Sequence, residues 1–262
     1  MTINFATKVK TWLRMVAERW QIASLAAAAR QQNLDNLAHR LQAIIPDLSD
    51  QYSHFKVEGE YFRLKCRTQH AFQIKLALRA IELLLKEKPK PDEPIALVDI
   101  GDSSGNHLTY LRNILLDQVP FNLYNYQTLS VNLDEVAVNK IKSKNLDALL
   151  VRAEDLFEKY GIEPDIAMSF EMLEHLPDPI LFLDRMSQKS NCKYLVITVP
   201  YLACSRVGLH HIRHRRQKEV SPENTHIFEL SPGDWKLIFQ HSGWEVVEEL
   251  ISNIQYGPGY IR

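Results

Sequence analysis

The second half of the chain alternates short apolar runs with amphipathic helical patterns, and this alternation most restricts the possible fold. Five runs rich in strand-forming residues follow residue 95: IALVDI, YQTLSVNL, DALLV, DIAMSF and KYLVITV. Helical patterns at 105–117, 134–144, 178–190 and 232–242 separate or follow them,. This order predicts parallel strands with right-handed crossovers and helices on both faces of one sheet. We therefore predict an α/β, doubly wound sheet, with WEVVEELI (244–251) as a sixth strand and ligands bound at the carboxyl ends of the strands,.

The first ninety residues have a different texture and are predicted to be helical. Apolar residues recur at helical spacing from Leu13 to Trp20 and again from Leu34 to Ile45, where Pro46 ends the pattern,. A third helix is predicted over 60–87, followed by a proline-containing linker at 89–94,. We predict two parts, a helical N-terminal cap over 1–90 and a doubly wound domain over 95–262.

Composition excludes several broad classes of protein. The 262 residues carry a formal net charge of −1, so no global charge favours nucleic acid or membrane,. Three widely spaced cysteines imply no disulfide framework, which favours the cytoplasm,. No run is long enough for a membrane span. Residues 1–30 carry five basic groups and one acid beside Trp12 and Trp20, so this helix either lies on a membrane surface or, as we expect, packs its aromatic side on the domain,.

The loop DIGDSSG (99–105) follows the first predicted strand. Gly101 permits a tight turn close to a ligand, and Gly105 lets the next helix approach the sheet,. The start of that helix points N–H groups above the sheet, and the Ser103 hydroxyl can face a polar ligand there,. Such loops also occur for purely structural reasons, so this one is a weak signal when taken alone.

Polar residues also follow the second and third strands. Asn132 stands where an acid would hold ribose hydroxyls; its amide can still accept and donate, although without charge,. Replacing Asn132 with Asp is therefore expected to tighten cofactor binding. Asp134 is expected to cap the following helix. Glu154 and Asp155 are candidates for bonding an adenine amine, with a solvated helix start as the alternative.

The run PDIAMSFEMLEHLPDPILFLDRM (164–186) resembles the fourth strand and following helix of class I S-adenosylmethionine-dependent methyltransferases, in their small-molecule branch with an LEHL signature. LVDIGDSSG is similar to that family's first motif, KYLVITVPY to its fifth strand, and THIFELSPGDWKLIFQHSGWEVVEEL to its closing helix and strand. The resemblance covers 95–251. Two departures are Ser103 in place of the middle glycine and Asn132 in place of the acid.

The resemblance implies a Rossmann-like sheet of the seven-stranded type, S-adenosylmethionine as cofactor, and a small-molecule acceptor of the methyl group. It implies a cofactor-binding set that includes the residues discussed above. That set is Asp99, Gly101, Ser103, Gly105, Asn132, Glu154, Asp155, Phe170 and Glu171.

A histidine-rich, basic segment follows the fifth strand, where the family covers its acceptor pocket. Methyl transfer to oxygen or nitrogen needs a proton acceptor, for which histidine suits neutral pH. The candidates are His175 in LEHL and His210, His211 and His226. Arginines between 206 and 216 suit an anionic acceptor such as a sugar phosphate, nucleotide-sugar or lipid-linked intermediate, with a solvated basic loop as the alternative,. His210 and His214 have zinc-ligand spacing without a third ligand, so we predict no metal site,.

The resulting hypothesis is a cytoplasmic methyltransferase acting on oxygen or nitrogen of a small acceptor, with a homodimer through the N-terminal helices as one arrangement. The alternative is a non-catalytic, methyltransferase-like binding or scaffold protein, favoured by Ser103 and Asn132. A nucleic-acid methylase is disfavoured, because the Asn/Asp-Pro-Pro-aromatic run of amino-methylating enzymes is missing and the net charge is near zero,.

Overall fold

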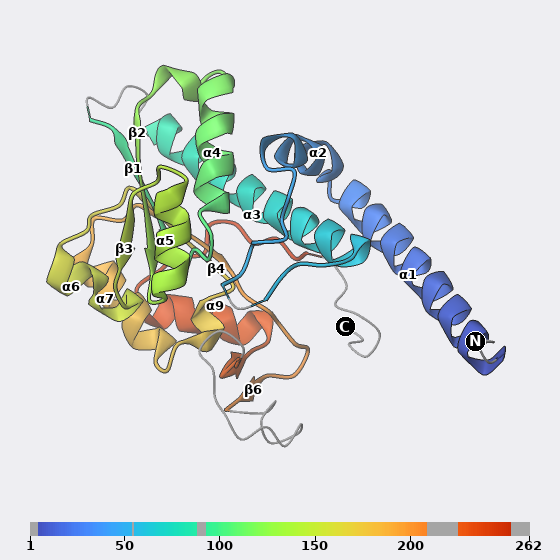
Figure 1. Ribbon diagram of the computed structural model, residues 1–262. Coiled ribbons are helices and arrows are strands. Elements are labelled where there is room, and N and C mark those ends of the chain that lie inside the picture. The colour runs from blue at the N-terminus through green and yellow to red at the C-terminus, as the bar shows by residue number, and fades with distance from the viewer. Residues whose placement is uncertain (1–4, 54, 88–92, 209–224, 253–262) are drawn as a thin grey trace. The chain divides into compact units, whose positions relative to one another are not determined.

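A computed structural model describes residues 5–53, 55–87, 93–208 and 225–252, with the side chains of 5–11 and 14 excepted. The chain divides into two compact units. One extends to Lys75 and takes in Ile251, and the other extends from Leu76 to Leu250. The division falls inside a single helix, and most of the proline-containing linker predicted at 89–94 lies outside the described residues. Figure 1 shows the order of the elements.

Helices form the N-terminal unit, as the apolar spacing predicts. They are α1 (Phe5–Gln31), α2 (Asp35–Ile44) and the first half of α3 (Glu60–Glu87). Leu34 and Leu41 are fully buried between them. The carboxyl end of α2 is closed by Arg67 of α3, whose guanidinium donates to the carbonyls of Leu41 at 3.0 Å and Ile45 at 2.5 Å. This residue thereby satisfies carbonyls that a helix end leaves without partners.

The aromatic side chains of α1 do not pack on the rest of its unit. Trp12 and Trp20 are 61% and 67% exposed, and Leu13 and Val16 beside them are also exposed. Within its own unit, this helix therefore does not bury its aromatic side. Among the helices that the structure describes, none combines the length and hydropathy needed to cross a membrane.

The second unit is built on a five-stranded parallel sheet of order β3-β2-β1-β4-β5. The strands are β1 (Ile95–Ile100), β2 (Tyr126–Asn132), β3 (Ala148–Leu150), β4 (Ile166–Phe170) and β5 (Tyr194–Thr198). They coincide with the five predicted apolar runs to within one or two residues. The helices around them are α4 (Asn106–Asp117), α5 (Glu135–Ser143), α6 (Leu156–Tyr160), α7 (Pro179–Lys189) and α9 (Pro232–His241), with short 3-10 turns η1 (Phe121–Leu123), η2 (Ala153–Asp155) and η3 (Leu173–His175).

Helices cover both faces of the sheet, which confirms the doubly wound prediction. Val98 and Ile100 of β1 pack in one core with Phe182 of α7 and Trp235 of α9. Because side chains alternate along a strand, Asp99 between them points to the opposite face, where it meets His107 of α4,. The order reverses between β1 and β4, so the switch point of the sheet lies at the carboxyl end of β1,.

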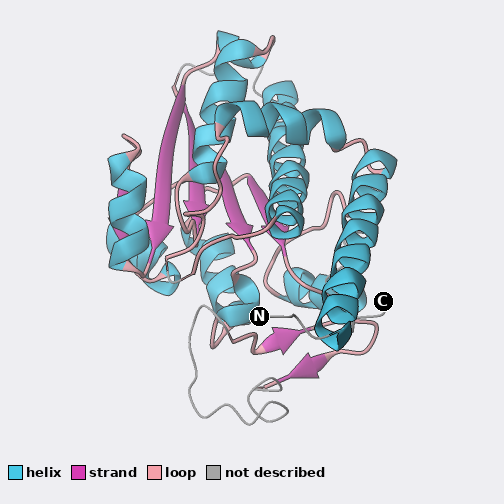
Figure 2. Ribbon diagram, turned by 45° about the vertical axis from the view of Figure 1, so that its right-hand side comes forward, coloured by secondary structure: helices cyan, strands magenta, loops and turns pink. Residues whose placement is uncertain are grey.

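The predicted sixth strand does not form, and the sheet has five strands among the described residues rather than the seven that the resemblance implies. Residues 244–252 are described without strand pairing. Trp244 is instead held by its side chain, which donates from Nε1 to the Leu183 carbonyl at 3.0 Å, while Val247 and Leu250 are exposed. Trp244 also packs against the core on one face of the sheet, whereas the later apolar residues of the segment stay exposed. A short antiparallel pair, β6 (Arg206–Val207) and β7 (Phe228–Glu229), lies beyond the arrowheads of the sheet in Figure 2.

Candidate functional site

The loop after β1 depends on two glycines with left-handed backbone. Gly101 has φ of +92°, and a Cβ there would lie 2.7 Å from Cγ of Met172, the residue that opens the turn after β4. Gly105 has φ of +76° and begins α4, and a Cβ there would lie 2.8 Å from Cδ1 of Leu146. The backbone angle disfavours a side chain at both positions, and the contact with Met172 adds a steric cost at Gly101,. The loop consequently packs tightly against the segments that follow β4 and α5.

Asp102 organises this loop, a role that the sequence analysis missed. Its Oδ1 accepts hydrogen bonds from the backbone N–H groups of Ser104 at 3.1 Å and Gly105 at 2.7 Å, and its Oδ2 accepts from the Ser130 hydroxyl at 2.8 Å. The side chain is buried. A carboxylate thus occupies the two backbone amides immediately before α4. The signal in the sequence is an aspartate followed by Ser-Ser-Gly, which is typical of a side chain bonding its own backbone two residues on.

Asp99 and His107 form a buried pair beside this loop. Asp99 Oδ2 lies 3.2 Å from His107 Nδ1, and the His107 ring meets the Phe170 ring edge to face at 4.8 Å between centroids. Burial, with the nearby charge of Asp102, raises the pKa of Asp99 to about 6. Burial lowers the pKa of His107, but the hydrogen bond and charge of Asp99 and the charge of Asp102 outweigh that effect and raise it overall. His107 therefore does not face solvent.

Asn132, at the end of β2, is bonded within the protein at both ends of its amide. Its Nδ2 donates to the Asp102 carbonyl and its Oδ1 accepts from the Asp134 N–H, each at 2.8 Å. Asp134 caps α5, as predicted, because its Oδ1 accepts from Val136 N at 3.0 Å. Asn132 therefore ties the ends of β1 and β2 together as part of the fold.

The acids after β3 lie in the η2 turn and the start of α6. Glu154 pairs with Arg152 and Asp155 with Lys159, each at 2.9 Å. Both acids are half-buried. Both acids therefore lie at the carboxyl end of β3, paired with neighbouring basic side chains.

The segment after β4 turns sharply at Glu171, a non-glycine residue with φ of +53°. A left-handed backbone at such a residue is uncommon and marks a position that the surrounding structure holds in place. Its N–H donates to the Thr198 carbonyl of β5 at 2.8 Å. The next residues form the η3 turn, which brings Glu174 into the interior and leaves His175 partly exposed.

Two predicted catalytic histidines meet at this turn. The rings of His175 and His226 lie edge to face with centroids 4.8 Å apart. His175 Nδ1 lies 3.0 Å from the Thr225 carbonyl, and His226 Nδ1 lies 3.2 Å from Glu229 Oε1. Because those partners are acceptors, each Nδ1 carries a proton. Arg206 holds Glu229 in turn, with Nη2 to Oε2 at 2.6 Å.

The remaining predicted residues divide between two places. Ser103 is half-buried in the loop after β1. His210 and His211, with the arginines at 213, 215 and 216, lie outside the described residues. In its described part, the structure thus brings His175 together with His226, and places His107 in contact with both Asp99 and Phe170. Glu174 and Glu229 were missed because nothing in the local pattern shows that an acid in LEHL is buried or that the acid of IFEL meets a histidine.

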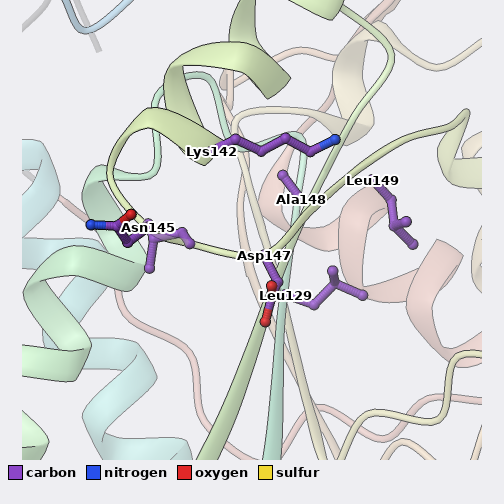
Figure 3. A pocket seen from close by; sticks show the side chains of 7 residues that line it. Leu129, Lys142, Asn145, Asp147, Ala148 and Leu149 are labelled. Carbon is purple, nitrogen blue, oxygen red and sulfur yellow. The ribbon is translucent and has the colours of Figure 1, made fainter.

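A hollow of about 520 Å³ lies elsewhere in the second unit, between the end of α5 and the beginning of β3. Its lining includes Lys142, Asn145, Asp147 and Leu149, which Figure 3 shows around it. Residues 145–147 precede β3, so this hollow opens at the amino end of that strand. It therefore lies away from the carboxyl ends, where the predicted cofactor residues stand.

Comparison with known proteins agrees with the fold. A family model described as a methyltransferase domain matches residues 70–249. The chain belongs to this family, and the resemblance to class I S-adenosylmethionine-dependent methyltransferases is confirmed. The search of curated proteins finds no match.

Several solved structures are similar to the chain at low sequence identity, and one of them, CurJ, has a TM-score above 0.5. The CurJ carbon methyltransferase is 15% identical with a TM-score of 0.51, over 97% of this chain and 68% of that one. The plantazolicin methyltransferase BpumL, solved with SAH, is 13% identical with a TM-score of 0.41, over 80% and 77%. A Haloferax volcanii protein solved in complex with the Trm112 methyltransferase activator is 16% identical with a TM-score of 0.43, over 68% and 74%.

Proposed function

We propose that the chain transfers a methyl group from S-adenosylmethionine to an oxygen or nitrogen of a small acceptor. Family membership supports this function. The observation that supports it most directly is the pair of acidic side chains in and before the loop after β1. Asp102 already occupies the amides at the start of α4, and Asp99 lies behind it, so this edge of the sheet is acidic. An acidic edge disfavours a pyrophosphate and favours a cofactor with a positive sulfonium and ammonium.

The donor site that we propose consists of the residues at the ends of β1 to β4. We include Gly101, where the lack of a Cβ lets the loop lie directly against the Met172 turn. Asp99, Ser103, Gly105 and Asn132 form the floor at β1 and β2. The other proposed contacts are Glu154, Asp155, Phe170 and Glu171.

S-adenosylmethionine supplies a methyl group on a good leaving group, so the chain's own task is mainly to position the acceptor and manage its proton. His175 and His226 suit the second task. Their Nδ1 atoms are held by Thr225 and Glu229, and we assign proton acceptance to the Nε2 side of each ring,. We place the acceptor beside them, and extend the candidate base set to His210 and His211.

We further propose that the acceptor is anionic, such as a sugar phosphate, a nucleotide-sugar or a lipid-linked intermediate. This proposal rests on the basic residues at 213–218. Arg206 does not contribute an uncommitted charge, because it is bound to Glu229 through Nε at 2.9 Å as well as Nη2. A screen of neutral and anionic acceptors with labelled methyl donor would test this class. Faster transfer to neutral acceptors would contradict it.

A non-catalytic binding module is the second candidate. The observation that favours it is Asn132, whose amide is bonded at both ends within the protein and cannot offer a carboxylate to a ribose. A module of this kind would retain the sheet and the acidic loop without turnover.

Calorimetric titration with S-adenosylmethionine and S-adenosylhomocysteine tests the donor site. We expect micromolar binding by the wild type and at least a tenfold loss in Gly101→Leu, because its side chain must displace Met172. Gly161→Ala is the matched control, since Gly161 also has a left-handed backbone but a Cβ there meets nothing within 4 Å. No binding by a folded wild type at millimolar ligand would reject the donor site. Binding without turnover across the acceptor screen would favour the binding module.

We also propose a homodimer through the N-terminal helices. The exposed tryptophans and neighbouring apolar residues of α1 support it, because large apolar side chains gathered on one helix commonly mark an interface,.

A further inference from the structure

A buried carboxylate without a hydrogen-bond partner lies next to the two histidines. Glu174 is fully buried, and neither of its carboxylate oxygens has a hydrogen-bond partner among the residues that the structure describes. Its Oε1 lies 3.7 Å from Nε2 of His175, which is beyond hydrogen-bond length,. Buried carboxylates are normally paired, hydrogen-bonded or bound to a metal.

Two further acids lie near Glu174. Burial first, and then the charges of Glu171 and Glu229, raise the pKa of the Glu174 carboxyl well above the ordinary value, against a lowering by its own backbone N–H. A divalent cation at this carboxyl would offset both the burial and the repulsion.

Potential ligand atoms are already gathered at this point. Glu174, His175 and His226 each offer one ligand atom, and those atoms lie within 4.8 Å of one another. The backbone holds the two segments together, since Ile227 N donates to the Glu174 carbonyl at 2.7 Å. The cluster therefore does not depend on long, mobile side chains.

The hydrogen bonds behind the ligands are those that metal-binding histidines usually have. A histidine that binds a metal generally donates its other ring N–H to a carbonyl or carboxylate, which fixes the tautomer. His175 has Thr225 O at 3.0 Å and His226 has Glu229 Oε1 at 3.2 Å in this role. Arg206 in turn orients Glu229.

We propose that Glu174, His175 and His226 bind a divalent first-row transition metal ion at the carboxyl end of the sheet. Two imidazoles and one carboxylate suit Zn²⁺ or Mn²⁺ better than Mg²⁺, and three protein ligands leave positions open for another molecule. This site was not expected from the sequence, where His210 and His214 were the histidines with ligand spacing. With the ion bound, the two histidines are ligands and do not act as proton acceptors.

Metal binding by the full chain tests the proposal directly. The protein is stripped with a chelator and then titrated with Zn²⁺ and Co²⁺, following heat and the visible absorption of Co²⁺, with Mg²⁺ as the hard-cation comparison. We expect one tight equivalent of Zn²⁺ per chain, and a loss of affinity of tenfold or more in Glu174→Gln and in His226→Gln. His241→Gln is the matched control, because His241 is an exposed histidine at the end of α9.

Thermal unfolding distinguishes a loss of metal binding from a loss of stability in the variants. Without metal, Glu174→Gln should melt at or above the wild-type temperature, because it removes a buried, unbonded charge. Zn²⁺ should raise the Tm of the wild type and of His241→Gln but not that of Glu174→Gln. Absence of a stoichiometric ion in the wild type, or equal binding by Glu174→Gln and His226→Gln, would overturn the site. Titration of the same samples with S-adenosylhomocysteine shows separately whether the proposed donor site fails.

Discussion

At the scale of single residues, glycine and aspartate have different structural roles in the loop after β1. Gly101 and Gly105 provide backbone angles and space that no other residue provides, while Asp102 provides the hydrogen bonds that hold the loop closed. The glycines could be recognised from the sequence because their spacing after an apolar run is informative. The partners of Asp102 could not be, because Ser130 is brought beside it only when β2 pairs with β1.

Replacing Gly101 with alanine should reduce stability more than the same change at Gly161. Both positions have left-handed backbone, which costs an alanine about 1–2 kcal/mol,. Only at Gly101 must the new Cβ also displace Met172, so we expect a free energy of unfolding at least about 1 kcal/mol lower than that of Gly161→Ala,. Urea unfolding of the two variants measures the difference. Equal losses would show that the turn after β4 yields without cost.

The Asp99 pair should make stability depend on pH. In the folded state, the pKa of the Asp99 carboxyl is raised from 3.8 to about 6. Between these values the folded state keeps a proton that the unfolded state releases, so the free energy of unfolding falls as pH rises. His107 has a raised pKa, so its contribution is present at low pH and is lost as pH rises through the folded-state value. Both effects lower the free energy of unfolding as pH rises. Between pH 4 and pH 6, the free energy of unfolding of the wild type should fall by up to about 3 kcal/mol relative to that of Asp99→Asn, since one pKa unit corresponds to about 1.4 kcal/mol. The free energies come from urea unfolding of both proteins at each pH. A constant difference between the wild type and Asp99→Asn across this range would contradict the assignment.

The structure changes what is expected of Asn132→Asp. From the sequence alone, a carboxylate here should bind ribose hydroxyls better. In the structure, the change removes the Nδ2 donor and sets an oxygen against the Asp102 carbonyl, now 2.8 Å from Nδ2. We expect a loss of about 1–3 kcal/mol in the free energy of unfolding, comparable to leaving a buried acceptor unpaired. If Asn132→Asp is as stable as the wild type and binds S-adenosylhomocysteine more tightly, the ribose role is supported instead.

At the scale of elements, local signals located the strands and helices well. The five strands follow continuous apolar runs, and Asp134 and Asp178 cap helices α5 and α7 as short polar residues before apolar patterns typically do,. The failure at 244–251 has a physical cause. A strand needs a partner strand, and this apolar segment pairs with none among the described residues, although its composition favours a strand.

The cap on α5 gives a prediction for this scale. Asp134 accepts from Val136 N, so Asp134→Ala should lower the free energy of unfolding by about 1 kcal/mol, whereas Asp134→Asn should retain most of the cap,. Chemical unfolding monitored by far-UV circular dichroism compares the two. A loss in Asp134→Asn as large as that in Asp134→Ala would assign the effect to charge at the helix start and not to the hydrogen bond.

At the scale of the whole molecule, the apolar side chains of α1 are the main feature without a role in the described fold. If they form the proposed dimer interface, Trp12→Ser/Trp20→Ser should convert a dimer to a monomer in light scattering after size exclusion. Leu116→Ser is the control, because Leu116 is an exposed apolar residue on α4 in the second unit. A wild type that is monomeric at high micromolar concentration would reject the interface.

The sequence by itself determined the class of fold, the positions of the sheet strands and the loop that turns at the carboxyl end of β1. These follow from local causes, namely apolar runs, helical spacing, helix caps and glycine angles, each of which acts over a few residues. Only the tertiary structure decided that Asp102 fills the start of α4, that Asn132 is consumed by the fold, and that Glu174 is buried beside His175 and His226. These properties depend on burial and on partners as many as fifty residues away, such as Thr225 for His175. A local pattern cannot contain them, because hydrogen-bond partners and local dielectric are set when the strands pair and the chain packs.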